Sequence, residues 1–201
     1  MRGPLRTGLV HGRARVQAHR RARRCLARDL SDVTAGREAL PRLARKHGLD
    51  LARSVWMGHS AGGHLALWAV TRGSSPSALA QPSWQPRRVV GLAPVSDLKE
   101  ADALALSRHV AVELLGGTAR QQPARYADAS PAEHLPLRVP AVIVHGTKDN
   151  VVPLAMNRGF VDRARKAGGD IRLVMPEDAD HFDVIDPRSK AWPQVLEAIG
   201  A

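Results

Sequence analysis

A serine stands among small residues between two apolar stretches of the sequence. Gly58, His59, Ser60, Ala61 and Gly62 form a G-x-S-x-G motif between the strand-like run "SVWMG" and the helix-like run "AGGHLALWAVTRG". A strand, a tight turn and a helix in this order predict a nucleophile elbow, which presents the serine hydroxyl at the start of the helix. We expect a side chain at either glycine of the motif to collide with the adjacent strand or helix. Ser60 is therefore the predicted nucleophile.

Two residues downstream could activate this serine. A serine hydroxyl is a weak nucleophile, so it needs a base, and a carboxylate must orient that base. Asp149 follows the strand-like run "VPAVIVHG", and His181 lies in the loop after the next such run, "DIRLVMPE". The chain order Ser60, Asp149, His181 is the order of elbow-type catalytic triads. Asp97, which ends the strand-like stretch "RRVVGLAPVSD", is the alternative acid.

The remaining histidines have weaker claims on the chemistry. His59 and His64 flank the elbow, and we expect them to pack or to support the site rather than to act as its base. His145 ends a strand-like run, and we expect it to pack. No pair of histidines or cysteines has metal-ligand spacing, and no glycine-rich loop could hold a phosphate. We therefore expect no metal and no cofactor.

The elements that must position these residues alternate along the chain. Helices are predicted over residues 31–48, with Ser31 as N-cap, a kink at Pro41 and Gly48 as the stop, over 153–166, and at the C-terminus. Residues 98–135 form a polar stretch broken into short helical pieces. Because strand-like apolar runs alternate with helices, the fold class is α/β, a mostly parallel sheet covered by helices on both faces. Each candidate then lies at a carboxyl end of a strand, where ligands bind in such sheets.

Length and composition are those of one ordinary domain. The chain has 201 residues, 44% of them hydrophobic and only 3% aromatic, which predicts an aliphatic core. Its single cysteine, Cys25, excludes an internal disulfide and fits a reducing compartment. The sequence has no secretory signal and no apolar run long enough for a membrane span. We expect a cytoplasmic protein without a membrane partner.

The positive charge is concentrated at the N-terminus. Residues 1–30 contain nine arginines and one acidic residue, Asp29, which accounts for +8 of the total charge of +11. A basic arm could bind nucleic acid. We favour a leader that is disordered or not native to the fold, because the segment has no aromatic residue for base stacking and no recognisable binding motif. The expected division is a leader over 1–30 and a domain over 31–201, with a helical insert at about 98–135.

Three stretches together resemble the α/β-hydrolase fold family: "GHSAGGHLALW", "HGTKDNVVP" and "DADHFDVIDP". The resemblance runs from about residue 30 to the C-terminus. It is strongest to small esterases and kynurenine-formamidase-like members, which are similar to the catalytic domain of prolyl oligopeptidases. It implies Ser60 as nucleophile, Asp149 as acid, His181 as base and the Ala61 N–H as one oxyanion donor.

The start of the chain departs from this family. Members usually have several further strands before the elbow, one of which ends in a His-Gly-Gly loop that gives the second oxyanion donor. Here only "LVHGRAR" precedes the similar region, and His11 and Gly12 echo that loop faintly. We therefore expect an N-terminally shortened fold in which the elbow strand is an exposed sheet edge that allows self-association.

These observations predict a serine hydrolase of small carboxylic esters or amides, with the small-molecule substrate as its partner, acting through an acyl-enzyme without a cofactor. The alternative is a catalytically impaired fragment of the fold that at most binds ligand. A nucleic-acid-binding protein that uses the basic arm is a third and less favoured hypothesis. The identity of the acyl and leaving groups stays open.

Overall fold

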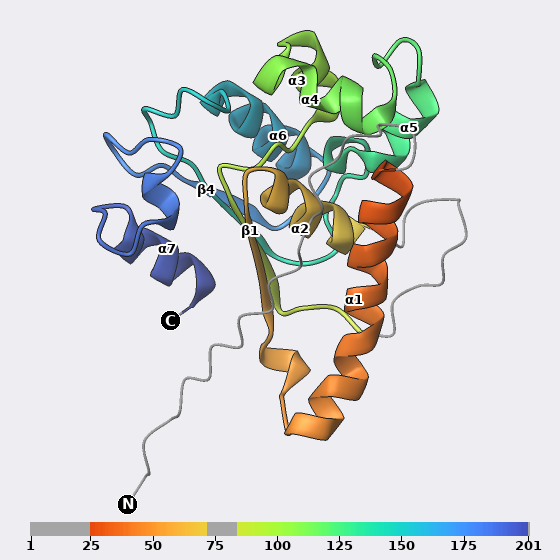
Figure 1. The fold of residues 1–201 in the computed structure, drawn as a ribbon. Helices are drawn as coiled ribbons and strands as arrows, with labels where there is room; N and C mark the ends of the chain where they lie inside the picture. Colours follow the sequence, from red (N-terminus) through yellow and green to blue (C-terminus); the bar gives the residue numbers. More distant parts are fainter. Residues whose placement is uncertain (1–24, 72–83, 201) are drawn as a thin grey trace, which may run out of the picture.

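The computed structural model describes residues 25–71 and 84–200, in which short strands alternate with helices (Figure 1). The elements in chain order are α1 (Cys25–His47), η2 (Leu51–Arg53), β1 (Val55–His59), α2 (Ala61–Thr71), β2 (Arg88–Leu92), α3 (Leu98–Ala103), α4 (Leu106–Leu115), α5 (Pro123–Ala129), η3 (Pro131–Glu133), β3 (Ala141–Val144), α6 (Leu154–Lys166), β4 (Ile171–Val174), η4 (Asp183–Ile185) and α7 (Trp192–Ile199). Within α4, residues 107–109 have a left-handed backbone. The fold class is α/β, as the sequence predicts.

The four strands form one parallel sheet in the order β1-β2-β3-β4. Successive side chains of a strand point to opposite faces, so each inner strand supplies both faces of the sheet. Val89 of β2 and Ile143 of β3 pack on one face with residues of α2 and α6. Val90 and Val142 pack on the other face with residues of α7. Burial on both faces explains why these strands read as continuous apolar runs.

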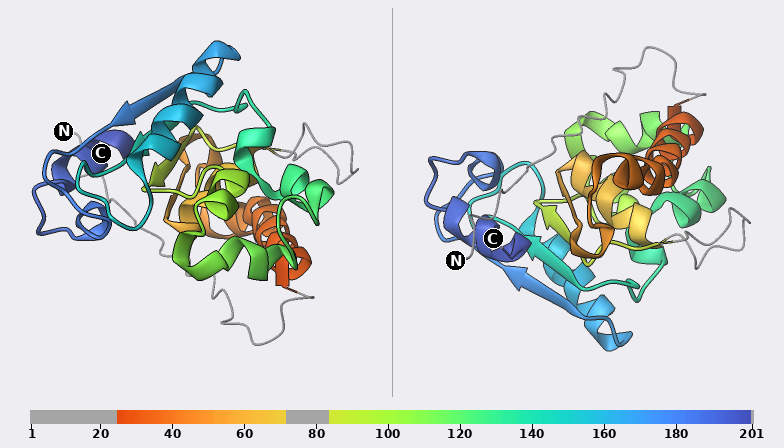
Figure 2. Two further views of the ribbon diagram at one scale, coloured as in Figure 1. Left: turned by 90° about the horizontal axis from the view of Figure 1, so that it is seen from above. Right: turned by 90° about the horizontal axis from the view of Figure 1, so that it is seen from below.

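The helices form a layer on each face of this sheet (Figure 2). α2 connects β1 to β2 and α6 connects β3 to β4, and both pack on the same face. α7 follows β4 and covers the opposite face. Because all four strands are parallel, their carboxyl ends lie along one edge of the sheet, where the predicted site residues follow them.

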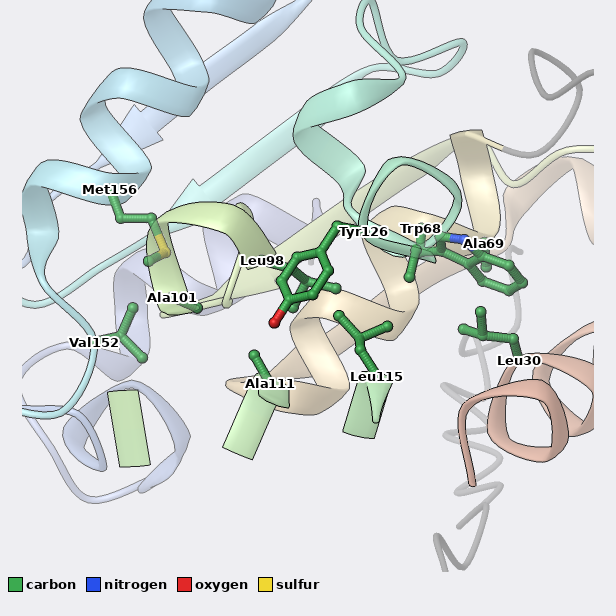
Figure 3. Close-up of a cluster of buried hydrophobic side chains, with 11 residues drawn as sticks. Leu30, Trp68, Ala69, Leu98, Ala101, Ala111, Leu115, Tyr126, Val152 and Met156 are labelled. Carbon is green, nitrogen blue, oxygen red and sulfur yellow. The ribbon is translucent and has the colours of Figure 1, made fainter. Parts of the chain in front are cut away.

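The segment 98–135 contains the short helices α3, α4, α5 and η3, and it packs beside α2. Leu98, Leu115 and Tyr126 lie in one buried cluster with Trp68 of α2 (Figure 3). The Trp68 indole N–H also donates to the Asp128 carbonyl oxygen at 2.9 Å. The helix that begins at the elbow is therefore held by this segment as well as by the sheet.

Helix α1 begins at Cys25, six residues earlier than predicted, so the expected N-cap at Ser31 is wrong. Leu30 is only 5% exposed and packs in the cluster that contains Trp68, and this tertiary contact outweighs the local capping preference of Ser31. Pro41 lies inside the helix, and Gly48 follows it with a φ of +63°, as expected of a stop residue. The division at residue 30 stays a prediction. Residues 1–24, with His11 and Gly12, lie outside the described residues.

Candidate active site

The predicted elbow is present between β1 and α2. Ser60 has a φ of +53°, a left-handed backbone that a residue with a side chain adopts only under constraint. Three backbone hydrogen bonds supply the constraint. The Ser60 N–H donates to the Leu92 carbonyl of β2 at 2.9 Å, and the Ser60 carbonyl accepts from the N–H groups of His64 and Val95 at 3.0 and 3.3 Å. The turn therefore holds the serine at the carboxyl end of β1 and at the start of α2.

The close packing of this turn depends on two glycines, although not on the pair that the motif suggests. A Cβ atom on Gly58 would overlap the carbonyl group of Gly62. A Cβ atom on Gly63 would stand 2.7 Å from the Cβ of Pro94. No atom lies within 4 Å of a Cβ built on Gly62. The expected collision is thus confirmed for Gly58 and wrong for Gly62, because the helix turns Gly62 outward and Gly63 toward Pro94, in the loop after β2.

Ala61 is the first residue of α2 and is exposed. The first N–H groups of an α-helix have no acceptor within the helix, and this end of the helix carries a partial positive charge. The backbone beside Ser60 can therefore stabilise a developing negative charge. The assignment of the Ala61 N–H as oxyanion donor stays a prediction.

Asp149 and His181 are joined by a short buried contact. The His181 Nδ1 lies 2.7 Å from Asp149 Oδ2, and the two side chains are 3% and 0% exposed. The other carboxylate oxygen, Oδ1, accepts the backbone N–H groups of Val151 and Val152 at 2.8 and 2.9 Å. The loop that follows β3 thus fixes the carboxylate, and the carboxylate in turn fixes the imidazole ring.

Hydrogen bonds keep Asp149 ionised despite its burial. Burial is the largest single influence and by itself would raise the pKa of this carboxyl. Hydrogen bonds from His145, His181 and the N–H groups of Val152 and Val151 together outweigh it, so the pKa lies well below the usual range of an aspartate. The group is therefore a charged acceptor that can stabilise a proton gained by His181.

A glycine lets the loops that carry the acid and the histidine approach each other. A Cβ atom on Gly146 would overlap the carbonyl group of Ala179. The same Ala179 carbonyl accepts the Lys148 N–H at 2.9 Å. This direct backbone contact places Asp149 and His181 side by side although 32 residues separate them.

His59 forms the contact between the elbow and the histidine loop. Its Nε2 lies 2.8 Å from the backbone oxygen of His181, and the two imidazole rings have centroids 4.4 Å apart. A carbonyl oxygen can only accept, so the His59 Nε2 carries the proton in this contact. Burial lowers the pKa of His59 below 6.5, chiefly through loss of solvation. No hydrogen bond joins the Ser60 hydroxyl to the His181 ring among the residues that the structure describes.

Asp97, the alternative acid, lies in a different environment. Its Oδ1 caps α3 by accepting the N–H groups of Lys99 and Glu100 at 3.0 and 3.1 Å. Its Oδ2 pairs with Arg163 of α6 at 2.8 Å. A carboxylate held in this way orients a helix and a guanidinium rather than an imidazole.

Sequence reasoning underestimated His145 and overlooked Asn157. His145 is buried at the end of β3, but it does more than pack, because its Nε2 lies 3.2 Å from Asp149 Oδ2. Asn157 of α6 is also completely buried, and its side-chain amide contacts His145. The signal that could have identified them is a polar residue in an otherwise apolar run, since a buried polar group needs a partner. His64, by contrast, bonds through Nε2 to the Ala129 carbonyl at 2.8 Å and supports α2, within the range of roles expected for it.

The described residues offer no group of three histidine, cysteine, aspartate or glutamate side chains that could hold a metal ion. Across residues 25–71 and 84–200, the helices are too short or too polar to cross a membrane.

Comparisons with known proteins concern the family and the fold of the chain. The family model BD-FAE matches residues 19–163. The Thermogutta terrifontis esterase Est2 has 28% sequence identity and a TM-score of 0.61, covering 86% of this chain and 61% of the esterase. Esterase B of Lactobacillus rhamnosis has 18% sequence identity and a TM-score of 0.69, and the match covers 87% of this chain and 59% of the esterase. The acylaminoacyl peptidase of Pyrococcus horikoshii has 18% sequence identity and a TM-score of 0.64, and the match covers 85% of this chain and 26% of the peptidase.

The chain thus spans about three-fifths of the two esterases and about a quarter of the peptidase. No curated protein sequence matches it.

Proposed function

The chain belongs to the BD-FAE family and has the α/β-hydrolase fold, and from this premise we propose that it hydrolyses small carboxylic esters or amides through an acyl-enzyme. The observation that carries the proposal is that three residues follow the carboxyl ends of β1, β3 and β4, along one edge of the sheet. Ser60 sits in a left-handed elbow, Asp149 and His181 share a 2.7 Å contact, and His59 bridges the two parts.

Each residue has a defined role in the proposed reaction. The Ser60 hydroxyl oxygen attacks the carbonyl carbon while His181 takes the hydroxyl proton. Asp149 holds the imidazole ring and stabilises its charged form, and the Ala61 N–H donates to the oxyanion. The C–O or C–N bond then breaks, and His181 returns the proton to the leaving alcohol or amine. Water then attacks the carbonyl carbon of the acyl-enzyme while His181 takes a proton from it. The bond to the Ser60 oxygen breaks, His181 returns the proton to that oxygen, and the carboxylic acid product is released.

Related structures favour short acyl esters as the substrate class. Est2 of Thermogutta terrifontis has been solved with butyrate and with propionate bound, and also after phosphoramylation by tabun, at 28–29% identity to this chain. These forms concern the esterase itself. For this chain they support the use of short acyl esters and of phosphorus reagents as the first probes.

Labelling with a fluorophosphonate probe tests the nucleophile. We expect stoichiometric labelling that maps by peptide mass spectrometry to Ser60 and disappears in Ser60→Ala. Ser130 is a matched control, because it is a buried serine that bonds to the Leu98 N–H and has no part in the elbow. Labelling should persist in Ser130→Ala. Labelling that survives Ser60→Ala would overturn the assignment.

A substrate panel tests the bond type. It should compare p-nitrophenyl acetate, butyrate and octanoate with an N-formyl anilide and an aminoacyl anilide. We expect the two short esters to give the highest kcat/KM. A preference for either anilide would move the proposal from ester to formamide or peptide-like amide hydrolysis.

A second candidate function is ligand binding with weak or no turnover, and the edge position of β1 favours it. Among the described residues β1 pairs only with β2, and Ala61 is the one oxyanion donor proposed. Loss of a single oxyanion donor typically lowers kcat by about 10²–10³. Stoichiometric labelling of Ser60 without turnover of any ester in the panel would support this candidate. Turnover above about 1 s⁻¹ would exclude it.

A further inference from the structure

The proposed mechanism does not use the buried imidazole of His145. His145 directly follows β3, is 0% exposed, and contacts both the carboxylate of Asp149 and the side chain of Asn157. Polar groups in such a place are costly unless each finds a partner, so its contacts define what the ring does.

The side chain of Asn157 fixes the proton position of His145. The Asn157 Nδ2 lies 2.9 Å from the Pro94 carbonyl oxygen, which can only accept, so the amide nitrogen must face Pro94. The same Nδ2 lies 2.9 Å from the His145 Nδ1, which must therefore accept. The proton of the His145 ring accordingly sits on Nε2.

That proton lies between two acceptors, one of them the predicted acid. The His145 Nε2 donates to the Val152 carbonyl oxygen at 3.0 Å and also lies 3.2 Å from Asp149 Oδ2. Asp149 Oδ2 is also the oxygen that accepts from His181 Nδ1 at 2.7 Å. One oxygen thus faces two imidazole N–H groups, at 2.7 Å from His181 and 3.2 Å from His145, while Oδ1 receives two backbone N–H groups.

We propose that His145 and Asn157 are positioning residues that orient Asp149 and limit the negative charge that it directs at His181. The contacts run from Pro94 in the loop after β2, through Asn157 of α6 and His145 directly after β3, to Asp149 and His181. They begin beside the elbow, because Pro94 is the residue against which Gly63 packs. The proposal rests on the proposed function, in which Asp149 acts through His181.

The predicted consequence concerns both rate and pH dependence. Without the N–H of His145, Asp149 is less firmly oriented, and more of its negative charge faces His181. We expect a lower kcat and an acid limb of kcat/KM that moves to higher pH, because an added negative charge favours the protonated imidazole. His59 from β1 and Asp149 are the titratable side chains that contact His181 from other elements.

The test compares variants of two buried histidines. His145→Leu removes the N–H donated to Asp149, whereas His145→Gln keeps an amide N–H. Asn157→Leu removes the group that fixes the ring. His64→Leu is the matched control, because His64 is also buried and also bonds a backbone carbonyl through Nε2, but it contacts neither Asp149 nor His181. All four variants are measured for melting temperature and for kcat and KM on p-nitrophenyl butyrate from pH 5 to 9.

We expect His145→Leu to lower kcat by about ten- to hundredfold with little change in KM, the size typical of a lost hydrogen bond to a charged group. Asn157→Leu should shift the pH profile in the same direction, and His145→Gln should recover most of the loss. His64→Leu should lower the melting temperature without moving the profile. Equal effects of His145→Leu and His64→Leu on kcat and on the profile would overturn the proposal.

A second measurement separates this proposal from the proposed function. The titration of the His181 ring can be followed by ¹H–¹⁵N NMR of the imidazole nitrogens, with or without turnover. If the wild type neither labels nor turns over ester, the proposed function fails. The positioning role of His145 is then judged by the titration alone. A midpoint that moves upward in His145→Leu but not in His64→Leu supports it, and an unchanged midpoint in both refutes it.

Discussion

The strands β3 and β1 both lead into the candidate site, but they are held in different ways. All four residues of β3 are buried, and the strand lies between two neighbours. In β1, Met57 is 44% exposed and none of the five residues is fully buried. Among the described residues β1 has a neighbour on one side only. The proposed acid therefore follows a strand that is buried throughout, and the proposed nucleophile follows a strand that is paired on one side among the described residues.

The difference shows that the two halves of the site are ordered by different means. The Asp149 carboxylate is fixed by burial and by donors on both oxygens, so its geometry is a property of the core. Ser60 is fixed by the backbone of its own turn and by hydrogen bonds to β2 and α2. Changes in the core should therefore act on the acid, and changes in the turn should act on the nucleophile.

The largest expected effect separates the two strand-end carboxylates. Asp149→Asn should lower kcat by about 10⁴, because an amide at this position stabilises the wrong tautomer of the base. Asp97→Asn should change kcat little, because asparagine also caps helices and only the pairing with Arg163 is lost. Steady-state ester hydrolysis by both variants decides the point. The reverse ranking would move the acid to the end of β2.

The next effect tests the turn that ends β1. Gly58→Ala should lower the free energy of unfolding by about 1–3 kcal/mol, because its Cβ meets the backbone of Gly62. Gly62→Ala is the matched control, since its Cβ meets nothing and alanine favours a helix more than glycine does. Urea denaturation compares the two variants with the wild type. Equal destabilisation would show that the turn tolerates no side chain for reasons other than this contact.

The pH dependence of stability should also distinguish the elbow helix, which contains His64, from the loop after β3, which contains Asp149. Burial lowers the pKa of His64 below 6.5, so the unfolded chain takes up a proton in a range where the native protein does not. Stability should therefore fall as the pH drops below about 6.5. The pKa of Asp149 is lowered from the ordinary value of 3.8, so its ionised form stabilises the fold above pH 3.8. That contribution is lost as the pH falls below this value.

Melting temperatures from pH 3 to 8 test both windows. In His64→Leu, the melting temperature should change less with pH around pH 6 and should still fall below pH 3.8. In Asp149→Asn, the fall around pH 6 should remain and the fall below pH 3.8 should become smaller. Identical curve shapes for the two variants would contradict the assignment of the two windows.

The smallest expected effect concerns the open edge of β1. The Ser54 carbonyl and the Ser60 N–H bond to residues of β2 and the loop before it. Because backbone groups alternate along a strand, those of Val55, Met57 and His59 face away from β2. We expect weak, concentration-dependent self-association in the wild type and less of it in Met57→Lys, since a charge on an edge strand opposes pairing. Sedimentation velocity measures both, and equal association would argue against this edge as the contact.

Much of the site could be read from the sequence because its signals are local. The strand, turn and helix around Ser60, and the order of the three residues along the chain, follow from periodicity and from short motifs. The parallel sheet follows from the alternation of apolar runs with helices, and it brings the strand ends together. The predicted start of α1 was wrong by six residues. Capping by Ser31 is a local preference, whereas the packing of Leu30 on α2 is a tertiary contact that the local sequence does not show.

By itself the sequence determined which residues could react and which strand each one follows, because both depend on residue types and on spacing within a few turns of chain. Only the tertiary structure decided that Gly63 rather than Gly62 packs against Pro94 and that the carboxylate of Asp149 rather than of Asp97 contacts an imidazole. It also decided that His145 and Asn157 lie next to Asp149. The physical reason is that these contacts join elements far apart in the chain. Which groups form a buried hydrogen bond depends on how the helices pack on the sheet, because the packing decides which groups become neighbours. A local sequence pattern does not predict this packing.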